Sequence, residues 1–594
     1  MRKSFTLLAV GLLFLASCGK DEPEHITPEN GDDNSQVTPT PTPDPTTTEY
    51  AALKTYIDRT KHPHFRLGVA MGAWEYLSNK DMRAIALDNF DNMTPGNEMK
   101  YNTIVKDDGS MDFSTVKRLI SDARSAGFGI YGHTLAWHSQ QNVTYLNSLL
   151  ADVSVEGSGE TTLSLVTNSD CEGDDLANFR MRPYGGDLRA PDVVTPGADG
   201  TGHALMVPAT AKAAEDWDNQ FFLTSSHTFA AGEAFTLTMK IKADKAASVD
   251  LQAHGAIGSY LHYTIAGGTM SFTTEWTEFK YEGTVPSEAA GMQTIAWNLN
   301  KFAEANNYYF DDIVWTATTT YSGSRPQTAE EKREHLVEAM DRWIKGSMEA
   351  TGGYVTAWDV VNEAISGSGS DGAGNYALQH GTGGSNFFWQ DYLGDELYVR
   401  KAVELARKYF AESGGSPSDL NLFVNDYNLE GDWDSNKKCT SLVNWVKKWE
   451  ADGVTKIDGL GTQMHVSCSM NAATQKSREA AVENMFKILA ASGKLIKITE
   501  LDVGIQDASG NTLSTTSCTE EHFKAIAAYY QFIIDKYFEI IPAAQQFGIT
   551  LWSPLDSPVN SYWRAGEPIG LWDQHYARKA AYDAVAEAIK KNLQ

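Results

Sequence analysis

Short apolar runs alternate with longer amphipathic segments along most of the chain. The runs are five to eight residues long and rich in β-branched residues, which is typical of buried strands, whereas the segments between them have helical periodicity. Eight such runs occur, at 66–71, 90–94, 129–136, 354–361, 421–425, 457–464, 495–499 and 547–553. Strands that alternate with helices predict an α/β fold, here a parallel (β/α)8 TIM barrel that a last helix at 578–591 closes.

One connection is too long for this pattern. About 190 residues separate the third strand from the next helix, far more than a normal loop between a strand and a helix. Strict alternation of apolar and polar residues recurs within them, at 235–242, 249–254, 295–300 and 309–315. The alternation predicts an all-β sandwich (jelly-roll) inserted at 156–320, between barrel parts at 50–150 and 325–594.

The chain begins with a segment typical of export. Two basic residues precede an apolar run at 5–15, which is too short to span a bilayer, and Leu-Ala-Ser-Cys follows at 15–18. This pattern resembles a bacterial lipoprotein signal at 1–18, with Cys18 as the lipidated residue; an ordinary secretory signal is the alternative. A Pro- and Thr-rich linker at 19–49 would then tether the protein to the outer membrane or cell surface.

The amino-acid composition indicates which classes of binding partner the protein can have. The net charge of −28 argues against nucleic acid and anionic membrane surfaces, and it is compatible with a neutral polymer, although solubility alone is the favoured explanation. The four cysteines after Cys18 are scattered without metal-ligand spacing, so neither a zinc site nor a disulfide framework is predicted.

Two strands end in a glutamate. The run at 354–361 leads into Asn362 and Glu363, and the run at 495–499 leads into Glu500, with Asp502 two residues later. Catalytic groups of parallel barrels lie at these strand ends, and a retaining glycosidase needs one ionised and one protonated carboxyl group about 5–5.5 Å apart. His465 and Asp502 can keep Glu500 charged, whereas the apolar neighbours of Glu363 favour its protonated form. Either glutamate alone could equally be a solvated strand-end acid.

Six motifs occur in one order at the strand ends. They are Gly-His-Thr-Leu-Ala-Trp-His at 132–138, Trp-Asp-Val-Val-Asn-Glu at 358–363, Val-Asn-Asp-Tyr-Asn at 424–428, Gly-Thr-Gln-Met-His at 461–465, Ile-Thr-Glu-Leu-Asp at 498–502, and Trp552. In these stretches the chain resembles glycoside hydrolase family 10, the family of endo-β-1,4-xylanases. The resemblance implies retaining hydrolysis of xylan and xylo-oligosaccharides by a monomer, with Glu500 as nucleophile, Glu363 as acid/base and His465 and Asp502 as support, without cofactor or metal.

The resemblance also implies a set of substrate-binding side chains. Those at the cleaved sugar are Asn362, His133, Trp137, Gln463, Trp552 and Trp563. Those at the next sugar towards the non-reducing end are Asn97 and Lys100, and Tyr427 stacks on the leaving-group side. One position departs from the family pattern, because Gly96 stands where the family has a sugar-binding glutamate and Glu98 is out of place. We expect weaker or rearranged sugar binding there.

The predicted sandwich resembles carbohydrate-binding modules of the family 4/9/22 type, chiefly at 309–315. Aromatic rings stack on sugar C–H faces, and the candidates for this role are Trp217, Tyr260 and His262. Asp311 or Asp312, with Glu172 and Asp174, could hold a structural calcium ion, but bonding to nearby backbone is favoured and no metal is assigned. For the whole chain, two alternatives stay open: a retaining barrel glycosidase on another β-1,4-glycan, and a non-catalytic glycan-capture lipoprotein.

Overall fold

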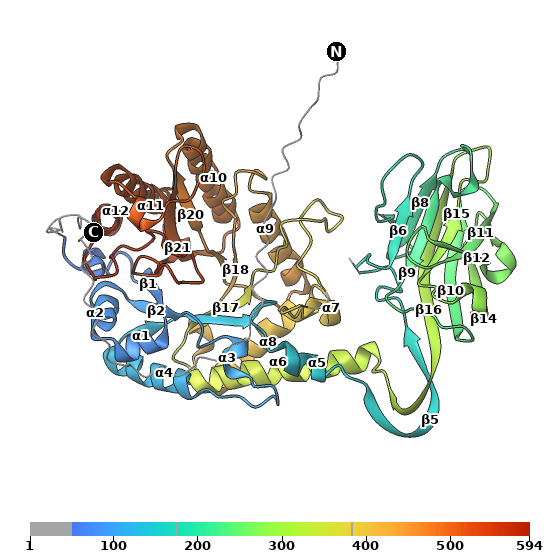
Figure 1. Ribbon diagram of the computed structural model, residues 1–594, viewed down its shortest axis with the longest axis horizontal. Helices are drawn as coiled ribbons and strands as arrows, with labels where there is room; N and C mark the ends of the chain where they lie inside the picture. Colours follow the sequence, from blue (N-terminus) through green and yellow to red (C-terminus); the bar gives the residue numbers. More distant parts are fainter. Residues whose placement is uncertain (1–49, 174, 382–383) are drawn as a thin grey trace, which may run out of the picture.

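The computed structural model describes residues 50–173, 175–381 and 384–594 (Figure 1). The predicted signal at 1–18, its Cys18 and the linker at 19–49 lie outside these residues. Among the described helices, none has the length and apolar character needed to cross a membrane.

A parallel sheet forms the centre of the first structural unit. Its strand order is β3-β2-β1-β22-β21-β19-β18-β17-β4. The bounds are β1 (Arg66–Met71), β2 (Asn92–Pro95), β3 (Gly129–Ile130), β4 (Gly132–Ala136), β17 (Ala357–Asn362), β18 (Asn421–Asp426), β19 (Gly459–Thr462), β21 (Leu495–Gln506) and β22 (Gln546–Trp552). β3 and β4 are two halves of the single strand predicted at 129–136, so both ends of the order come from one stretch of chain. The predicted eight-stranded barrel is therefore confirmed.

Helices surround this sheet (Figure 1). They are α1 (Ala73–Ser78), α2 (Lys80–Asn89), α3 (Tyr101–Ile104), α4 (Ser114–Ala126), α5 (Val143–Ser148), α6 (Ala329–Thr351), α7 (Gln390–Leu393), α8 (Leu397–Glu412), α9 (Lys437–Trp449), α10 (Ala472–Ala491), α11 (Glu520–Ile540) and α12 (Ala580–Leu593). The segment before β2 forms two helices, because the Asn79 side chain accepts from the N–H groups of Asp81 and Met82 and starts α2 there. α6 begins at a capping box of Thr328 and Glu331.

The second unit consists of two antiparallel sheets, with strand orders β14-β10-β16-β8-β7 and β12-β11-β15-β9-β6; β5 also pairs with β16, and β13 with β11. The bounds are β5 (Val153–Ser164), β6 (Phe179–Arg182), β7 (Asp192–Val194), β8 (Ala204–Ala209), β9 (Gln220–Thr224), β10 (Ala234–Ala243), β11 (Ala247–His254), β12 (Tyr260–Thr264), β13 (Met270–Phe272), β14 (Thr277–Thr284), β15 (Thr294–Asn298) and β16 (Asn306–Arg325). Phe221 of one sheet stacks on Phe310 of the other at 4.4 Å between ring centroids, so the sheets face each other across a shared core.

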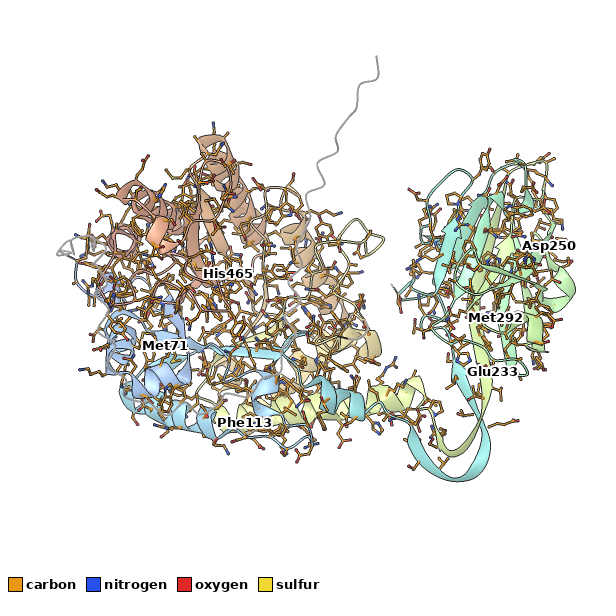
Figure 2. All side chains as sticks on the ribbon, in the orientation of Figure 1. Met71, Phe113, Glu233, Asp250, Met292 and His465 are labelled. Carbon is orange, nitrogen blue, oxygen red and sulfur yellow. The ribbon has the colours of Figure 1, made fainter. Side chains whose placement is uncertain are left out.

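The two units have separate cores and are joined by β5 and β16 (Figure 1). Figure 2 shows this division, with Met71, Phe113 and His465 in the barrel and Met292 and Asp250 in the sandwich. β5 and β16 pair with each other as far as Val153 and Arg325, so the paired strands extend past the predicted limits of 156 and 320. The ends of the insertion are therefore neighbours in space.

Candidate active site

Glu363 stands in a constrained turn directly after β17. Its φ angle is 54°, in the left-handed region that residues other than glycine rarely adopt. Its backbone N–H donates to the carbonyl oxygen of Asn425 at 2.7 Å, which fixes the turn against β18. The carboxyl group then receives three hydrogen bonds, from Trp137 Nε1 at 2.9 Å, from Gln463 Nε2 at 2.8 Å and from Asn362 Nδ2 at 3.3 Å. Strain of this kind at an acidic side chain is common in active sites.

Burial raises the pKa of Glu363 above its usual range. The hydrogen bond from Gln463 opposes this rise, but the negative charges of Asp426 and Glu500 add to it. Glu363 therefore keeps its proton at a higher pH than a solvated glutamate, as a general acid must.

Glu500 lies on β21 with only 5% of its surface exposed. Asn425 Nδ2 donates to its Oε1 at 2.8 Å, and His465 Nε2 lies 3.2 Å from its Oε2. Burial alone would raise the pKa of Glu500, but the hydrogen bond from His465, the charges of His133 and His465 and the bond from Asn425 lower it to about 2. Glu500 is thus ionised at neutral pH, as a nucleophile must be.

Two amide side chains connect the two glutamates. Asn425 Nδ2 donates both to Glu500 and, at 2.9 Å, to Asn362 Oδ1. Asn362 Nδ2 in turn lies 3.3 Å from Glu363 Oε1. A carboxyl group with a lowered pKa and one with a raised pKa are therefore connected through two amide side chains, and double displacement at a sugar acetal requires such a pair.

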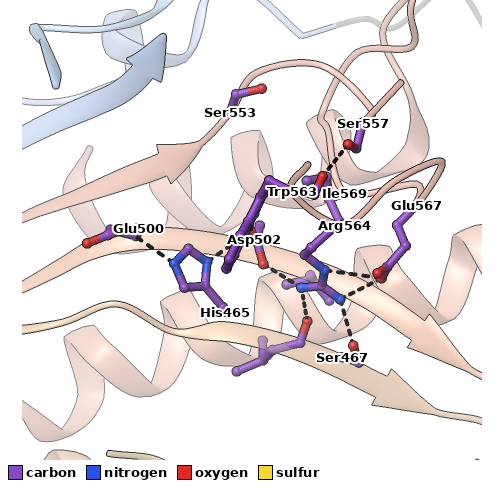
Figure 3. A network of polar contacts seen from close by, with 12 residues as sticks. His465, Ser467, Glu500, Asp502, Ser553, Ser557, Trp563, Arg564, Glu567 and Ile569 are labelled. Carbon is purple, nitrogen blue, oxygen red and sulfur yellow. Dashed lines mark hydrogen bonds and ion pairs between the residues drawn. The ribbon is translucent and has the colours of Figure 1, made fainter. Parts of the chain in front are cut away.

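His465 is held between two carboxylates (Figure 3). The short strand β20 (His465–Ser469) pairs in parallel with the extension of β21 and sets His465 beside Asp502. His465 Nδ1 lies 2.9 Å from Asp502 Oδ2, opposite its contact with Glu500. Burial disfavours a charged imidazole, but Asp502 and Glu500 outweigh burial and raise the pKa of His465 to about 10. The imidazolium therefore keeps Glu500 both oriented and anionic.

Arg564 extends this network and was not predicted from the sequence. Its guanidinium group contacts Asp502, Glu567, Ser467 Oγ and the carbonyl oxygen of Val466, which uses all five N–H donors (Figure 3). The arginine can lie against β21 because residue 504 is glycine: a Cβ there would be 1.9 Å from Arg564 Nη2. Arg564 thereby fixes the carboxylate that supports His465.

Loss of the His465 contact should change the pH dependence of the reaction. In the His465→Asn variant the pKa of Glu500 should rise, because burial raises this pKa and the hydrogen bond and charge of His465 that lower it are lost. A nucleophile with a higher pKa protonates sooner as the pH falls, so the acid limb of the kcat/KM profile should move up by about 1 to 2 pH units. The alkaline limb, which Glu363 sets, should move little. Profiles of kcat/KM from pH 3 to 9 measure both limbs. His335→Asn, at the start of α6, is the control, and an unmoved acid limb would contradict this role for His465.

The other predicted site residues join the same cluster. Lys100 Nζ lies 5.3 Å from the Trp137 ring centroid, and Asn97 Oδ1 accepts a hydrogen bond from Lys100 at 3.1 Å. The ring centroid of Trp552 lies 5.8 Å from that of His133 and 6.1 Å from that of His465. Trp563 Nε1 donates a hydrogen bond to Asp502 at 2.9 Å. Tyr427 lies at the end of β18, next to Asp426. The structure therefore brings the predicted residues together at the carboxyl ends of the barrel strands.

Gly96 follows β2, and a side chain would fit there. A Cβ at this position meets no atom within 4 Å, and its φ angle does not require glycine. Glu98 cannot replace the missing side chain, because it accepts from the backbone N–H of Ala73 at 2.9 Å. The Gly96→Glu variant should therefore fold normally and lower KM for short xylo-oligosaccharides about threefold or more, through added hydrogen bonds to sugar hydroxyls. Initial rates over a range of xylotetraose concentrations test this, with Gly96→Ala as control; an unchanged KM contradicts it.

Asn425 and Asp359 are further members of the site that sequence reasoning did not assign. Asp359 binds the ring Nδ1 of His133 at 2.8 Å and the hydroxyl group of Tyr131 at 2.6 Å. Both residues lie within the motifs at 424–428 and 358–363, so their types were visible. Their roles depend on side chains from other strands, which the motifs do not specify.

Two of the carboxylates considered for a calcium ion are engaged in other contacts. No group of three or more His, Cys, Asp or Glu residues that could hold a metal ion occurs in this part of the chain. Asp311 accepts from the backbone N–H groups of Ala198 at 2.7 Å and Asp312 at 2.8 Å, and Glu172 accepts from His203. Asp174 lies outside the described residues.

Comparison with known proteins identifies the family. The model of glycosyl hydrolase family 10 matches residues 56–163 and 258–588. Endo-1,4-beta-xylanase C of Paenibacillus barcinonensis is 32% identical over 327 residues, which cover 52% of this chain and 27% of that protein. Endo-1,4-beta-xylanase A of Cellvibrio japonicus is 32% identical over 278 residues, which cover 44% of this chain and 42% of that protein. The chain thus spans less than half the length of these relatives.

A solved structure shares the fold. Native xylanase10C from Cellvibrio japonicus aligns with 93% of this chain and 75% of its own, at a TM-score of 0.50 and 18% identity. The family match covers both parts of the barrel and every strand end that carries a site residue. The chain belongs to glycosyl hydrolase family 10.

Proposed function

We propose that this protein is a retaining endo-1,4-β-xylanase. The observation that carries the proposal is the pair Glu363 and Glu500, whose pKa values move in opposite directions and whose side chains are connected through Asn362 and Asn425. Glu500 attacks the anomeric carbon while Glu363 gives its proton to the leaving oxygen. Glu363 then takes a proton from a water molecule as its oxygen bonds to the anomeric carbon and the bond to Glu500 breaks, which releases the sugar with its configuration retained. Xylanase names among the relatives support xylan as the substrate.

Hydrolysis of purified polymers tests this proposal. The enzyme should release short xylo-oligosaccharides from xylan, and proton NMR of the first products should show the β-anomer. Purified glucan and mannan are the comparison substrates, since a barrel glycosidase on another β-1,4-glycan would prefer one of them. Release from none of the three would favour a glycan-capture protein and overturn the proposal.

We also propose that the sandwich is a carbohydrate-binding module. Support comes from the sheet β12-β11-β15-β9-β6, where His254, Tyr260 and His262 follow one another with ring centroids 5.7 and 4.8 Å apart. His254 is 3% exposed, and its Nδ1 has no hydrogen-bond partner. Trp217, by contrast, is 54% exposed on the turn before β9. Adjacent aromatic rings suit a sugar, which offers C–H faces for stacking.

Deletion of the sandwich should separate targeting from catalysis. Val153 pairs with Arg325, so a two-residue turn can join them once the residues between are removed. The shortened enzyme should keep its activity on soluble xylan within about twofold and lose about fivefold or more on insoluble xylan, as expected when a second binding site is removed. Sugar release from both forms of xylan is the measurement. Equal loss on both would contradict a targeting role, and Tyr260→Ala provides a variant with the domain still present.

The export segment completes the proposal. The protein would be a monomer that is held at the outer membrane or cell surface by a lipid on Cys18 and that reaches xylan through the linker. Cys18→Ala should then move the protein from the membrane fraction to the medium or periplasm, as blots of cell fractions would detect. An unchanged membrane fraction would contradict lipid anchoring at this residue.

A further inference from the structure

One buried carboxylate supports both the acid/base turn and the residue on the leaving-group side. Asp426, the last residue of β18, is 0% exposed. Its Oδ2 accepts from the backbone N–H of Ile365 at 2.9 Å, two residues after Glu363. Its Oδ1 accepts from the N–H of Tyr427 at 2.9 Å. The left-handed turn at Glu363 and the backbone of Tyr427 are therefore both attached to this carboxylate.

Lys438 completes the arrangement from the first turn of α9. It is 3% exposed, and its Nζ lies 2.8 Å from Asp426 Oδ1. The same Nζ lies 3.3 Å from the centroid of the Tyr427 ring. A cation over one face of the ring fixes its plane and leaves the opposite face for a sugar. The lysine thus contacts the aromatic ring and the carboxylate at the same time.

Stability gives little reason for such a pair. Removing two charges from water costs several kcal/mol per ion, and apolar residues of similar size are often as stable or more so. The geometry instead ties together the two groups that must meet at one glycosidic oxygen. We propose that Lys438 and Asp426 are positioning residues that couple binding of the leaving-group sugar at Tyr427 to proton donation by Glu363.

The coupling acts in the first chemical step and rests on the proposed function. Glu500 forms a bond to the anomeric carbon as the bond from that carbon to the leaving oxygen breaks. The electron pair of the broken bond stays on the oxygen, which takes the proton of Glu363. Tyr427 sets the position of that oxygen through the leaving sugar, whereas the turn after β17 sets the position of the proton. Because Tyr427 and the turn after β17 are both attached to Asp426, a displacement of one also displaces the other.

Substrates with different leaving groups test the coupling. Xylotetraose has a sugar leaving group that needs both stacking and a proton, whereas dinitrophenyl β-xylobioside has a phenolate that leaves without a proton. In the Lys438→Met variant, kcat/KM should fall about 10- to 100-fold on xylotetraose, as misplacement of a reacting group does. On the aryl substrate it should fall about threefold or less, because little acid catalysis is needed there. The double variant with Tyr427→Ala should lose little more than Tyr427→Ala alone, since coupled residues are not additive.

Control variants separate a specific effect of Lys438 from a general loss of activity. Lys494→Met removes an ion-paired lysine at the opposite end of the barrel, where Lys494 Nζ contacts Glu450 at 2.6 Å, and it should change neither rate by more than about twofold. Equal losses on both substrates, or none, would overturn the coupling. If Lys438→Met does not fold, Lys438→Gln and Asp426→Asn allow the same comparison. A wild-type enzyme that cleaves neither substrate would contradict the proposed function rather than this inference.

Discussion

Replacement of Glu500 with alanine should lower kcat on xylan by at least about 10⁴-fold, because no covalent glycosyl-enzyme can form without the carboxylate. Substrate binding should persist, since Asn362, Gln463 and the tryptophans remain. Reducing-sugar release measures the loss, and calorimetry with xylotetraose measures the retained binding. The control is Glu349→Ala on the exposed surface of α6. Unchanged release of reducing sugar would show that Glu500 is not the nucleophile.

Replacement of Glu363 with alanine should give a different pattern. On xylan kcat/KM should fall about 10²- to 10⁴-fold, the usual contribution of a general acid. On dinitrophenyl β-xylobioside the first step should remain fast, but the glycosyl-enzyme should accumulate, because no base activates water. A burst of phenolate followed by slow turnover is therefore expected.

An added anion provides the control for this second prediction. Azide can occupy the space left by the Glu363 side chain and needs no base to attack the glycosyl-enzyme. It should restore turnover of the aryl substrate and give a β-configured azide product. In the Glu500→Ala variant any rescue should instead give the α-configured azide, because azide then displaces the leaving group directly and no glycosyl-enzyme forms. Failure of azide to accelerate Glu363→Ala would contradict the acid/base assignment.

Periodicity predicted the barrel well because each strand and helix carries its own local signal. The strand at 129–136 appears as β3 and β4, with Tyr131 between them, and the short helix α1 precedes α2, which begins after Asn79. The alternation in the insertion likewise predicted strands, and the structure has two antiparallel sheets there. It did not give the strand order, since antiparallel partners in the two sheets come from distant parts of the sequence.

The site could be predicted where one strand carries both the residue and its context. Glu363 and Glu500 each end an apolar run, so their positions follow from the strand. Arg564 gave no such signal, because it lies in a loop and its partner Asp502 is 62 residues away. Lys438 is similar: in the sequence it is a lysine at the start of a helix, and only the packing of α9 against β18 shows it to be buried. Positioning residues act through neighbours in space, which periodicity does not record.

The pairing of Val153 with Arg325 affects how the barrel assembles. β4 and β17 are neighbours in the barrel sheet, yet the whole sandwich separates them along the chain. In an unfolded chain, contact between them would close a loop of about 220 residues, from 137 to 356, and the entropic cost of closure grows with loop length. Once the sandwich has folded and brought its ends together, the effective loop consists of 137–152 and 326–356, about 47 residues. By the logarithmic dependence on length, this shortening saves about 1.4 kcal/mol. The order of synthesis favours this route, since the sandwich emerges before β17 and can fold first.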